Sequence, residues 1–187
     1  MKKVIKGILI LFAVAIIMTP SFDTEAKTVT KYATKTIKLK EKCSDNSKTI
    51  HKVKRNTHLT VTKQGKKWAY IEYKGQTLYT HKVWLHSKRS PKKYTARQFR
   101  RKGVIHWGGK KWTWYTQRIL PGRGLHIPGR HLSKEGFVLD KDGYIVVAIT
   151  WSARRKRKIV PTPFGRYGKC YDCGSGGSAW RDIYTNW

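Results

Sequence analysis

Two aspartates near the C-terminal end of the chain have the type and spacing for acid–base chemistry. Asp172 and Asp182 lie ten residues apart, and each stands between an aromatic residue and a predicted strand or a glycine turn. Cleavage of a glycosidic bond needs a carboxylic acid that stays protonated near the leaving oxygen, and burial or a second carboxylate can keep it so. We therefore expect Asp172 to act as general acid and base, with Asp182 orienting it or stabilising charge.

Structural roles stay open for both aspartates. Asp172 precedes Cys173 and Gly174 and could hold a turn by accepting backbone N–H bonds. Asp182 could pair with its neighbour Arg181 or with a nearby lysine. Cations close to either side chain would favour the ionised form and weaken an acid catalyst.

The other reactive residues predict no metal site and no cofactor. The seven histidines lack metal-ligand spacing, and the chain has no serine nucleophile motif, phosphate loop or dinucleotide fingerprint. Cys170 and Cys173 have the spacing of redox or zinc sites, but no second pair of ligands accompanies them. On an extended strand their sulfurs would point to opposite faces and could not bond to each other. A nucleophilic Cys173 working with a histidine is an alternative.

Aromatic residues alternate along two expected hairpins and are candidates for stacking on sugar rings. One face of each hairpin must pack into a core, so only part of each set can meet a substrate. The candidate substrate-binding residues are Trp68, Tyr70, Tyr79, Trp112, Trp114 and Tyr115.

A run of five basic residues is a candidate site for phosphate groups of a surface polymer or lipid. Such a run is equally typical of a solvated loop without a specific ligand, because the whole chain is basic. The run consists of Arg154, Arg155, Lys156, Arg157 and Lys158.

The composition excludes several classes of protein. The chain has 187 residues and a formal net charge of +31, with 12% aromatic residues. A disordered polycation lacks this much apolar surface, and a polytopic membrane protein needs more than one long apolar run. The sequence therefore predicts a small, folded, basic protein with an anionic partner.

The N-terminus predicts export. A basic head with Lys2, Lys3 and Lys6 precedes twelve uncharged residues over 7–18, and Thr24 and Ala26 offer small residues for cleavage. Twelve residues are too few to span a bilayer, so we expect a secretory signal peptide over 1–26 rather than an uncleaved anchor. Its removal takes three lysines and two acids and leaves a net charge of +30. We expect a secreted, cell-wall-associated monomer that meets peptidoglycan and teichoic acid rather than intracellular nucleic acid.

Strand signals dominate the rest of the chain and predict an all-β protein of two units. Short alternating segments separated by turns fill residues 27–86, and residues 87–93 form a basic linker with Pro91. Residues 94–187 contain further hairpins and the continuous apolar run 144–150, which is typical of a strand buried on both faces. Short strands with glycines at the corners favour closed barrels.

The first unit resembles a bacterial SH3-like (SH3b) domain. Trp68 and Ile71 match the ends of that family's common Trp-x-x-Val sequence, and residues 75–80 follow its Gly-x-x-Gly-Tyr-Val, with Leu78 and Thr80 as departures. The resemblance implies binding to the cell wall through an aromatic-lined groove.

The second unit resembles the three-aspartate (3D) domain, a double-psi β-barrel related to rare-lipoprotein-A-like proteins and murein transglycosylases. The resemblance is clearest over 142–187 and implies that Asp172 and Asp182 are two of the family's aspartates. Thr150 stands where the family has its first aspartate. The segments that carry the likeness are residues 145–148, 162–165, 172–174 and 181–184.

Together these features predict a secreted protein that binds peptidoglycan and cleaves its glycan strands as a lytic transglycosylase. Two alternatives stay open. The first is a wall-binding protein without catalysis, as the missing aspartate suggests. The second is a cationic surface protein that binds anionic polymers, membranes or DNA.

Overall fold

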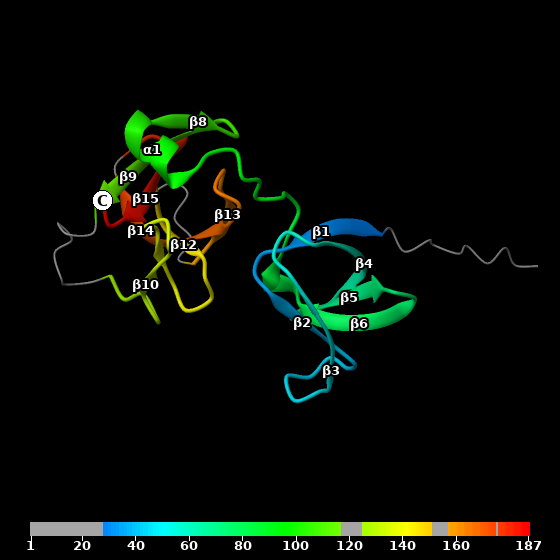
Figure 1. Cartoon of the computed structure of the whole chain (residues 1–187). Coiled ribbons are helices and arrows are strands. Elements are labelled where there is room, and N and C mark those ends of the chain that lie inside the picture. Colours follow the sequence, from blue (N-terminus) through cyan, green and yellow to red (C-terminus); the bar gives the residue numbers. More distant parts are fainter. Residues whose placement is uncertain (1–27, 117–124, 151–156, 175) are drawn as a thin grey trace, which may run out of the picture.

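The computed structural model describes residues 28–116, 125–150, 157–174 and 176–187 (Figure 1). The expected signal peptide over 1–26 lies outside these residues, as do Arg154, Arg155 and Lys156 of the basic run. The described residues form an all-β structure of two sheets with one short α-helix. No helix within them is long and apolar enough to cross a membrane.

The first sheet has seven strands in the order β3-β2-β6-β5-β4-β1-β7, and every neighbouring pair is antiparallel. A short 3-10 helix, η1 (Lys82–Trp84), precedes the last strand. The strands are β1 (Val29–Ala33), β2 (Ile37–Lys40), β3 (Thr49–Val53), β4 (His58–Gln64), β5 (Trp68–Tyr73), β6 (Gln76–His81) and β7 (Leu85–His86).

Alternating side chains build the core of the first sheet. Leu59 and Val61 in β4 and Ala69 and Ile71 in β5 are buried, while the residues between them reach solvent to some degree. Because successive side chains on a strand point to opposite faces, one face of each strand is apolar and the other carries polar and aromatic groups. Together with Leu39 the apolar face forms the core cluster of this unit.

The second sheet has eight strands, and the order of its main path is β10-β11-β12-β15-β9-β8, with β14 pairing β12 and β13 pairing β14. The helix α1 (Ala96–Lys102) precedes it and begins with a capping box between Thr95 and Gln98. The strands are β8 (Ile105–Trp107), β9 (Lys110–Thr116), β10 (His131–Leu132), β11 (Val138–Leu139), β12 (Ile145–Thr150), β13 (Ile159–Pro161), β14 (Tyr167–Gly174) and β15 (Trp180–Thr185).

Strand β12 lies at the centre of this sheet, and all six of its residues are buried. On one face Val147 and Ile149 join a large apolar cluster that includes Trp112. On the other face Val146 and Ala148 join a smaller apolar cluster. The prediction of a strand buried on both faces is confirmed.

The expectation of closed barrels is wrong for the described residues. In both sheets the chain of paired strands is open. The first sheet ends at β3 and β7, and the second ends at β10, at β8 and, on the branch through β14, at β13. The curvature visible in Figure 1 wraps each sheet around its core without joining these edges by hydrogen bonds.

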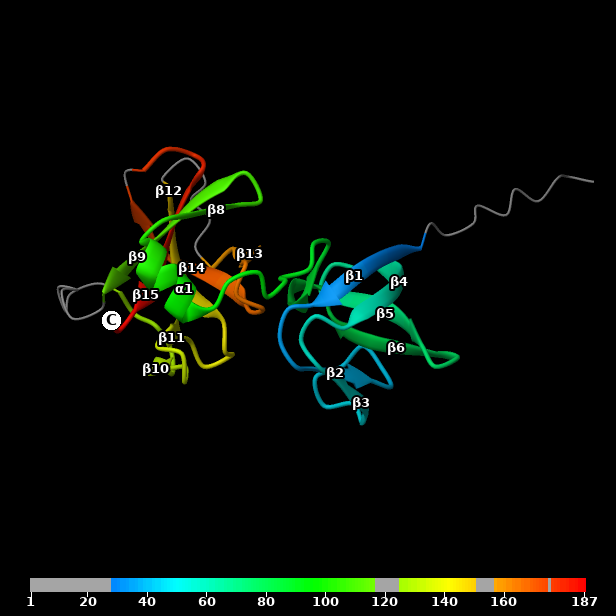
Figure 2. The same cartoon turned by 45° about the horizontal axis from the view of Figure 1, so that its top comes forward.

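The basic segment 87–93 joins the two sheets, but it is not a free tether (Figure 2). Ser90 is fully buried, and its hydroxyl donates to the carbonyl of Thr162 at 2.7 Å and accepts from the Thr162 N–H at 3.0 Å. The Ser90 N–H donates to the side-chain oxygen of Asn56 in the first unit at 3.1 Å. Composition predicted a basic linker over 87–93, but composition alone cannot reveal that one serine in a charged run is buried.

Two further contacts join the units directly. The buried hydroxyls of Thr34 and Tyr144 share a hydrogen bond of 2.5 Å, and Lys35 forms an ion pair of 2.7 Å with Asp142. Together with Ser90 they hold the first sheet against the turn that precedes β12.

Replacing Gly168 by alanine is expected to destabilise the second sheet by about 1–3 kcal/mol. A Cβ at this position would overlap Cγ2 of Val147 and press on Thr162, and both neighbours belong to packed strands or turns. Gly177→Ala is the control, because a Cβ there meets no atom within 4 Å. Urea unfolding of the chain from residue 27 measures both variants, and equal stability of the two would contradict the packing around β12.

Candidate functional site

Asp172 and Asp182 flank a single residue of β12. Ala148 pairs with Asp172 of β14 on one side and with Asp182 of β15 on the other. Residues paired across neighbouring strands project to the same face, and two strand spacings of about 4.8 Å separate the two Cα atoms by about 10 Å. The two carboxylates therefore extend on one face of the sheet above the small side chain of Ala148.

A β-bulge turns Asp172 onto this face. The register between β12 and β14 shifts after Val147, so Tyr171 is left without a partner and Asp172 pairs with Ala148. In an unbroken register Asp172 would pair with Ile149 and point into the large apolar cluster. Bulges redirect side chains in this way, because one extra residue reverses the alternation beyond it.

The same bulge places Cys170 and Cys173 on one face, opposite Val147 and Ile149. The expectation that their sulfurs point to opposite faces is wrong, because it assumed an unbroken strand. Both cysteines are free thiols. Burial, and then the neighbouring Cys173, raise the pKa of the Cys170 thiol, which donates to the carbonyl of Asp172 at 3.2 Å.

Asp182 is the more enclosed of the two carboxylates, with 9% of its surface exposed. Burial raises its pKa most, and the negative charge of Asp172 raises it further, against the lowering effect of a hydrogen bond from Thr113. The Thr113 hydroxyl donates to Asp182 at 2.7 Å, and the Trp180 indole N–H donates to that hydroxyl at 2.9 Å. The group with the strongest reason to hold a proton is therefore Asp182.

Asp172 is half-buried and accepts two hydrogen bonds. The Tyr184 hydroxyl donates to one oxygen at 2.5 Å, and the Cys173 N–H donates to the other at 2.8 Å. Burial raises the pKa of Tyr184, and its hydrogen bond to Asp172 raises it further, so this hydroxyl stays a donor. Two donors suit an Asp172 side chain that acts as an acceptor. The geometry therefore favours Asp182 as the acid and Asp172 as the charge-stabilising group, whereas the sequence suggested the opposite assignment.

The suggested pairing of Asp182 with Arg181 does not form in the described structure. Adjacent residues on β15 point to opposite faces, and Arg181 pairs with Ile149 on the face of the large cluster. Asp140 holds the turn before β12, because its buried carboxylate accepts from the N–H groups of Asp142 and Tyr144.

Sequence reasoning missed Thr113, Tyr184 and Trp180 as partners of the two carboxylates. A signal for Thr113 was present. The alternation that puts Trp112 and Trp114 on one face of β9 puts Thr113 on the other, beside the parallel strand β15. Nothing in the sequence showed that β9 and β15 are neighbours.

The first unit brings Trp68, Tyr70 and Tyr79 together. Trp68 pairs with His81, with ring centroids 4.3 Å apart, and Tyr70 pairs with Tyr79 at 5.0 Å. Trp84 extends the row, 4.4 Å from His81. We call these five half-buried side chains the aromatic strip.

Asp45 ties the β2–β3 loop to the aromatic strip. Its carboxylate lies 2.8 Å from the Lys67 ammonium and 2.5 Å from Nε2 of His81. These two hydrogen bonds lower the pKa of Asp45 to about 2, Lys67 contributing most. The loop is thereby held at the edge of the strip.

The second aromatic set divides differently from the prediction. Trp112 is 1% exposed within the large cluster, so the structure places it on the core face of its hairpin, and its role in substrate binding stays a prediction. Trp114 packs against the same cluster, with its ring 6.2 Å from Trp187. Tyr115 packs against the small cluster, 5.7 Å from Tyr184, and is therefore close to the Asp172 side of the pair.

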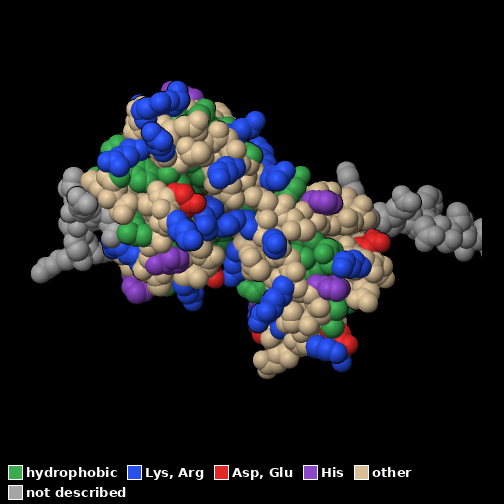
Figure 3. Space-filling model, viewed as in Figure 1, with side chains coloured by type: hydrophobic (Ala, Val, Ile, Leu, Met, Phe, Trp, Pro, Cys, Tyr) green, Lys and Arg blue, Asp and Glu red, His purple; other side chains and the backbone are tan. Residues whose placement is uncertain are grey.

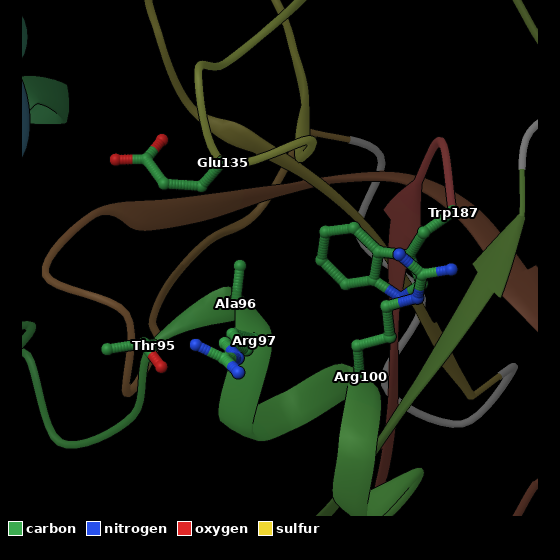
Figure 4. Close-up of a pocket in the computed structure, with 6 residues that line it drawn as sticks. All are labelled: Thr95, Ala96, Arg97, Arg100, Glu135 and Trp187. Atoms are coloured by element: carbon green, nitrogen blue, oxygen red, sulfur yellow. The ribbon is translucent and has the colours of Figure 1, made fainter.

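Of the basic run, Arg157 and Lys158 are described and exposed. Lys158 lines a cavity of about 430 Å³ that contains none of the predicted catalytic residues. A second cavity, of about 370 Å³, lies against α1 (Figure 4). There Arg100 extends toward the ring of Trp187.

The described part of the chain holds no cluster of three or more His, Cys, Asp or Glu side chains suited to a metal ion.

Comparison with protein-family models, with the curated proteins and with the solved structures finds no match. The SH3-like and three-aspartate resemblances therefore depend only on the residues quoted for them, and any function must be argued from the geometry of this chain.

Replacing Asp182 by asparagine is expected to stabilise the fold at neutral pH and to leave it unchanged near pH 3. The folded-state pKa of Asp182 lies above its unfolded value, so wild-type stability is full at low pH and falls as the pH rises toward that raised pKa. The amide of the variant does not ionise and avoids this loss. Thermal unfolding across the pH range measures it.

Asp142→Asn provides the control with the opposite sign. Burial works against ionised Asp142, but the hydrogen bond and charge of Lys35, with Lys169, outweigh burial and lower its pKa. This carboxylate therefore stabilises the fold above its unfolded pKa, and its loss should lower the melting temperature at neutral pH. A change in melting temperature of the same sign at neutral pH for Asp182→Asn and Asp142→Asn would contradict the different environments assigned to these two carboxyl groups.

Proposed function

We propose that this chain is a secreted protein that binds peptidoglycan and cleaves its glycan strands as a lytic transglycosylase. The observation that carries the proposal is the carboxylate pair on either side of Ala148, one member of which is buried with a raised pKa. Two carboxyl groups with different environments are the usual equipment for breaking a glycosidic bond.

In this mechanism protonated Asp182 donates its proton to the glycosidic oxygen as the bond between that oxygen and the anomeric carbon breaks. The Asp172 side chain, whose oxygens accept hydrogen bonds from Tyr184 and the Cys173 N–H, stabilises the positive charge that develops on the sugar. A hydroxyl of the same sugar then attacks the anomeric carbon and gives its proton to Asp182, which restores the acid. The products are a free glycan end and an anhydro sugar, and no water is consumed.

The first unit would supply binding. The aromatic strip presents ring faces of Trp68 and Tyr70 on the side of β5 opposite the core, and sugar rings stack on such faces. The ammonium group of Lys67 lies over the Trp68 ring and that of Lys63 over the Tyr70 ring, so positive charge accompanies these ring faces and a bound sugar would displace the two flexible side chains. The net charge attracts the chain to an acidic wall without choosing the bond that is cut.

One observation favours a wall-binding protein without catalysis. Thr150, which stands where the resembled family has an aspartate, is 3% exposed at the end of β12. If the reaction needs a third carboxylate at that position, the pair alone does not suffice and the second unit only binds.

Incubation of purified residues 27–187 with peptidoglycan sacculi tests catalysis. Mass spectrometry of the soluble products should show anhydro-muropeptides, and Asp182→Asn should reduce their release by about 100-fold or more, the usual contribution of a general acid. Asp172→Asn should also abolish most release. Glu135→Gln, which removes an exposed acid elsewhere in the second unit, should release products like wild type. Sedimentation with sacculi without released products would leave the non-catalytic interpretation.

Binding is tested separately by sedimentation with sacculi. Trp68→Ala and Tyr70→Ala are each expected to weaken binding by about tenfold, because each removes a stacking face. Val83→Ala, at an exposed apolar position of η1 outside the strip, is the control. Unchanged binding by the strip variants would place the binding surface elsewhere.

A further inference from the structure

A cationic cavity lies where the first unit, the connecting segment and the second sheet meet. It encloses about 430 Å³, a volume typical of ligand pockets. Its lining comes from the end of the first sheet, the connection, the β8–β9 hairpin, β13 with the residue before it, and β15.

Five of the side chains that line the cavity are cations and none is an acid. They are Lys88, Arg89, Lys110, Lys158 and Arg181, and within the described residues none of them forms an ion pair with a carboxylate. Figure 3 shows blue Lys and Arg side chains over much of one face of the molecule, with few red acids among them. The charge of the cavity is therefore not neutralised by nearby acids.

Arg181 is the decisive member because it is 7% exposed. Its hydrogen bonds run from Nη1 to the carbonyls of Trp180 at 2.5 Å and Ser178 at 3.3 Å, and burial lowers its pKa. Asp182, next to it on β15, points to the opposite face of the sheet. A guanidinium removed from water without an anion is costly, so this side chain lacks a partner that an anionic ligand could provide.

The field of the other cations reaches the histidine of the cavity. Burial lowers the pKa of His86 most, and the charges of Lys31, Lys88 and Lys158 lower it further, against a hydrogen bond with the backbone of Lys88. The pKa of His86 is thus held below its ordinary value, so the positive charge of the cavity comes from its Lys and Arg side chains.

The side chains of the cavity offer mostly N–H donors. Sugar hydroxyls and peptide amides need acceptors as well as donors, and the lining lacks carboxylates, side-chain amides and hydroxyl groups. Phosphate oxygens only accept, and Arg and Lys are the usual groups that bind them. Beside the cations, Trp107, Val160 and Pro161 form an apolar part of the lining that suits the carbon backbone between two phosphates.

We propose that this cavity binds a phosphodiester polymer of the bacterial surface, a poly(glycerol phosphate) chain being the simplest, with one phosphate on Arg181 and the neighbouring phosphates on Lys88, Lys110 and Lys158. The choice of a surface polymer rests on the proposed export of the chain. The chemistry of the cavity does not depend on glycan cleavage, because the carboxylate pair lies on the other face of the second sheet.

The test measures binding of purified poly(glycerol phosphate) by residues 27–187 at physiological ionic strength. The double variant Lys110→Gln with Lys158→Gln should weaken binding by about tenfold or more, since each cation contributes to phosphate binding. The matched control, Lys66→Gln with Lys134→Gln, removes the same charge at exposed positions outside the cavity and should change binding by less than about twofold. Equal losses in the two double variants would overturn the proposal.

Two further measurements test where the polymer binds and whether the site prefers it to another polyanion. Bound polymer should shift the NMR signals of the Trp107 indole N–H and the His86 ring, and no shift at either would contradict the cavity as the site. Double-stranded DNA of similar charge should bind more weakly than the polymer, and equal or tighter binding of DNA would overturn the assignment of the polymer. Asp182→Asn should bind poly(glycerol phosphate) like wild type, so loss of glycan cleavage and loss of this site remain distinguishable.

Discussion

The second unit depends on the complete burial of β12. A strand with both faces in apolar surroundings must be paired along both edges, because no water reaches its backbone groups. Its partners β14 and β15 each carry one of the two aspartates, and both aspartates pair with Ala148. Hydrophobic burial thus creates the rigid support for the carboxylate pair, and the bulge at Tyr171 decides that Asp172 faces its partner rather than the apolar cluster.

Strand β15 separates two kinds of chemistry by alternation alone. Asp182 projects to the face of the small cluster, where burial and Asp172 favour its protonated form. Arg181 projects to the opposite face, at a cavity of uncompensated cations. Because the sheet lies between them, the cations of the cavity do not approach the acid pair, and a carboxyl group with a raised pKa can exist in a protein with a net charge of +31.

The sequence predicted the elements better than their partners. The alternation in 68–73 and the apolar run at 144–150 correctly located the first core and the central strand. A strand with one buried face has an apolar residue at every second position, and a strand with two buried faces is apolar throughout. The sequence also singled out Asp172 and Asp182, because acidic residues are rare in this chain. The sequence did not predict the bulge, the parallel pairing of β9 with β15 or the burial of Ser90, since each depends on contacts between residues that are distant in the chain. Alternation showed that Trp112 and Trp114 share a face, but not that this face packs against the large cluster.

The proposed catalysis depends most on the raised pKa of Asp182, whose carboxyl group lies with that of Asp172 above Ala148. NMR titration of the carboxyl carbons in residues 27–187, wild type and Asp172→Asn, measures it directly. We expect the pKa of Asp182 to lie above the ordinary aspartate value in the wild type and to fall when the charge of Asp172 is removed. An Asp182 pKa at or below the ordinary value, or one that does not respond to Asp172→Asn, would contradict the assignment of Asp182 as the acid of the pair.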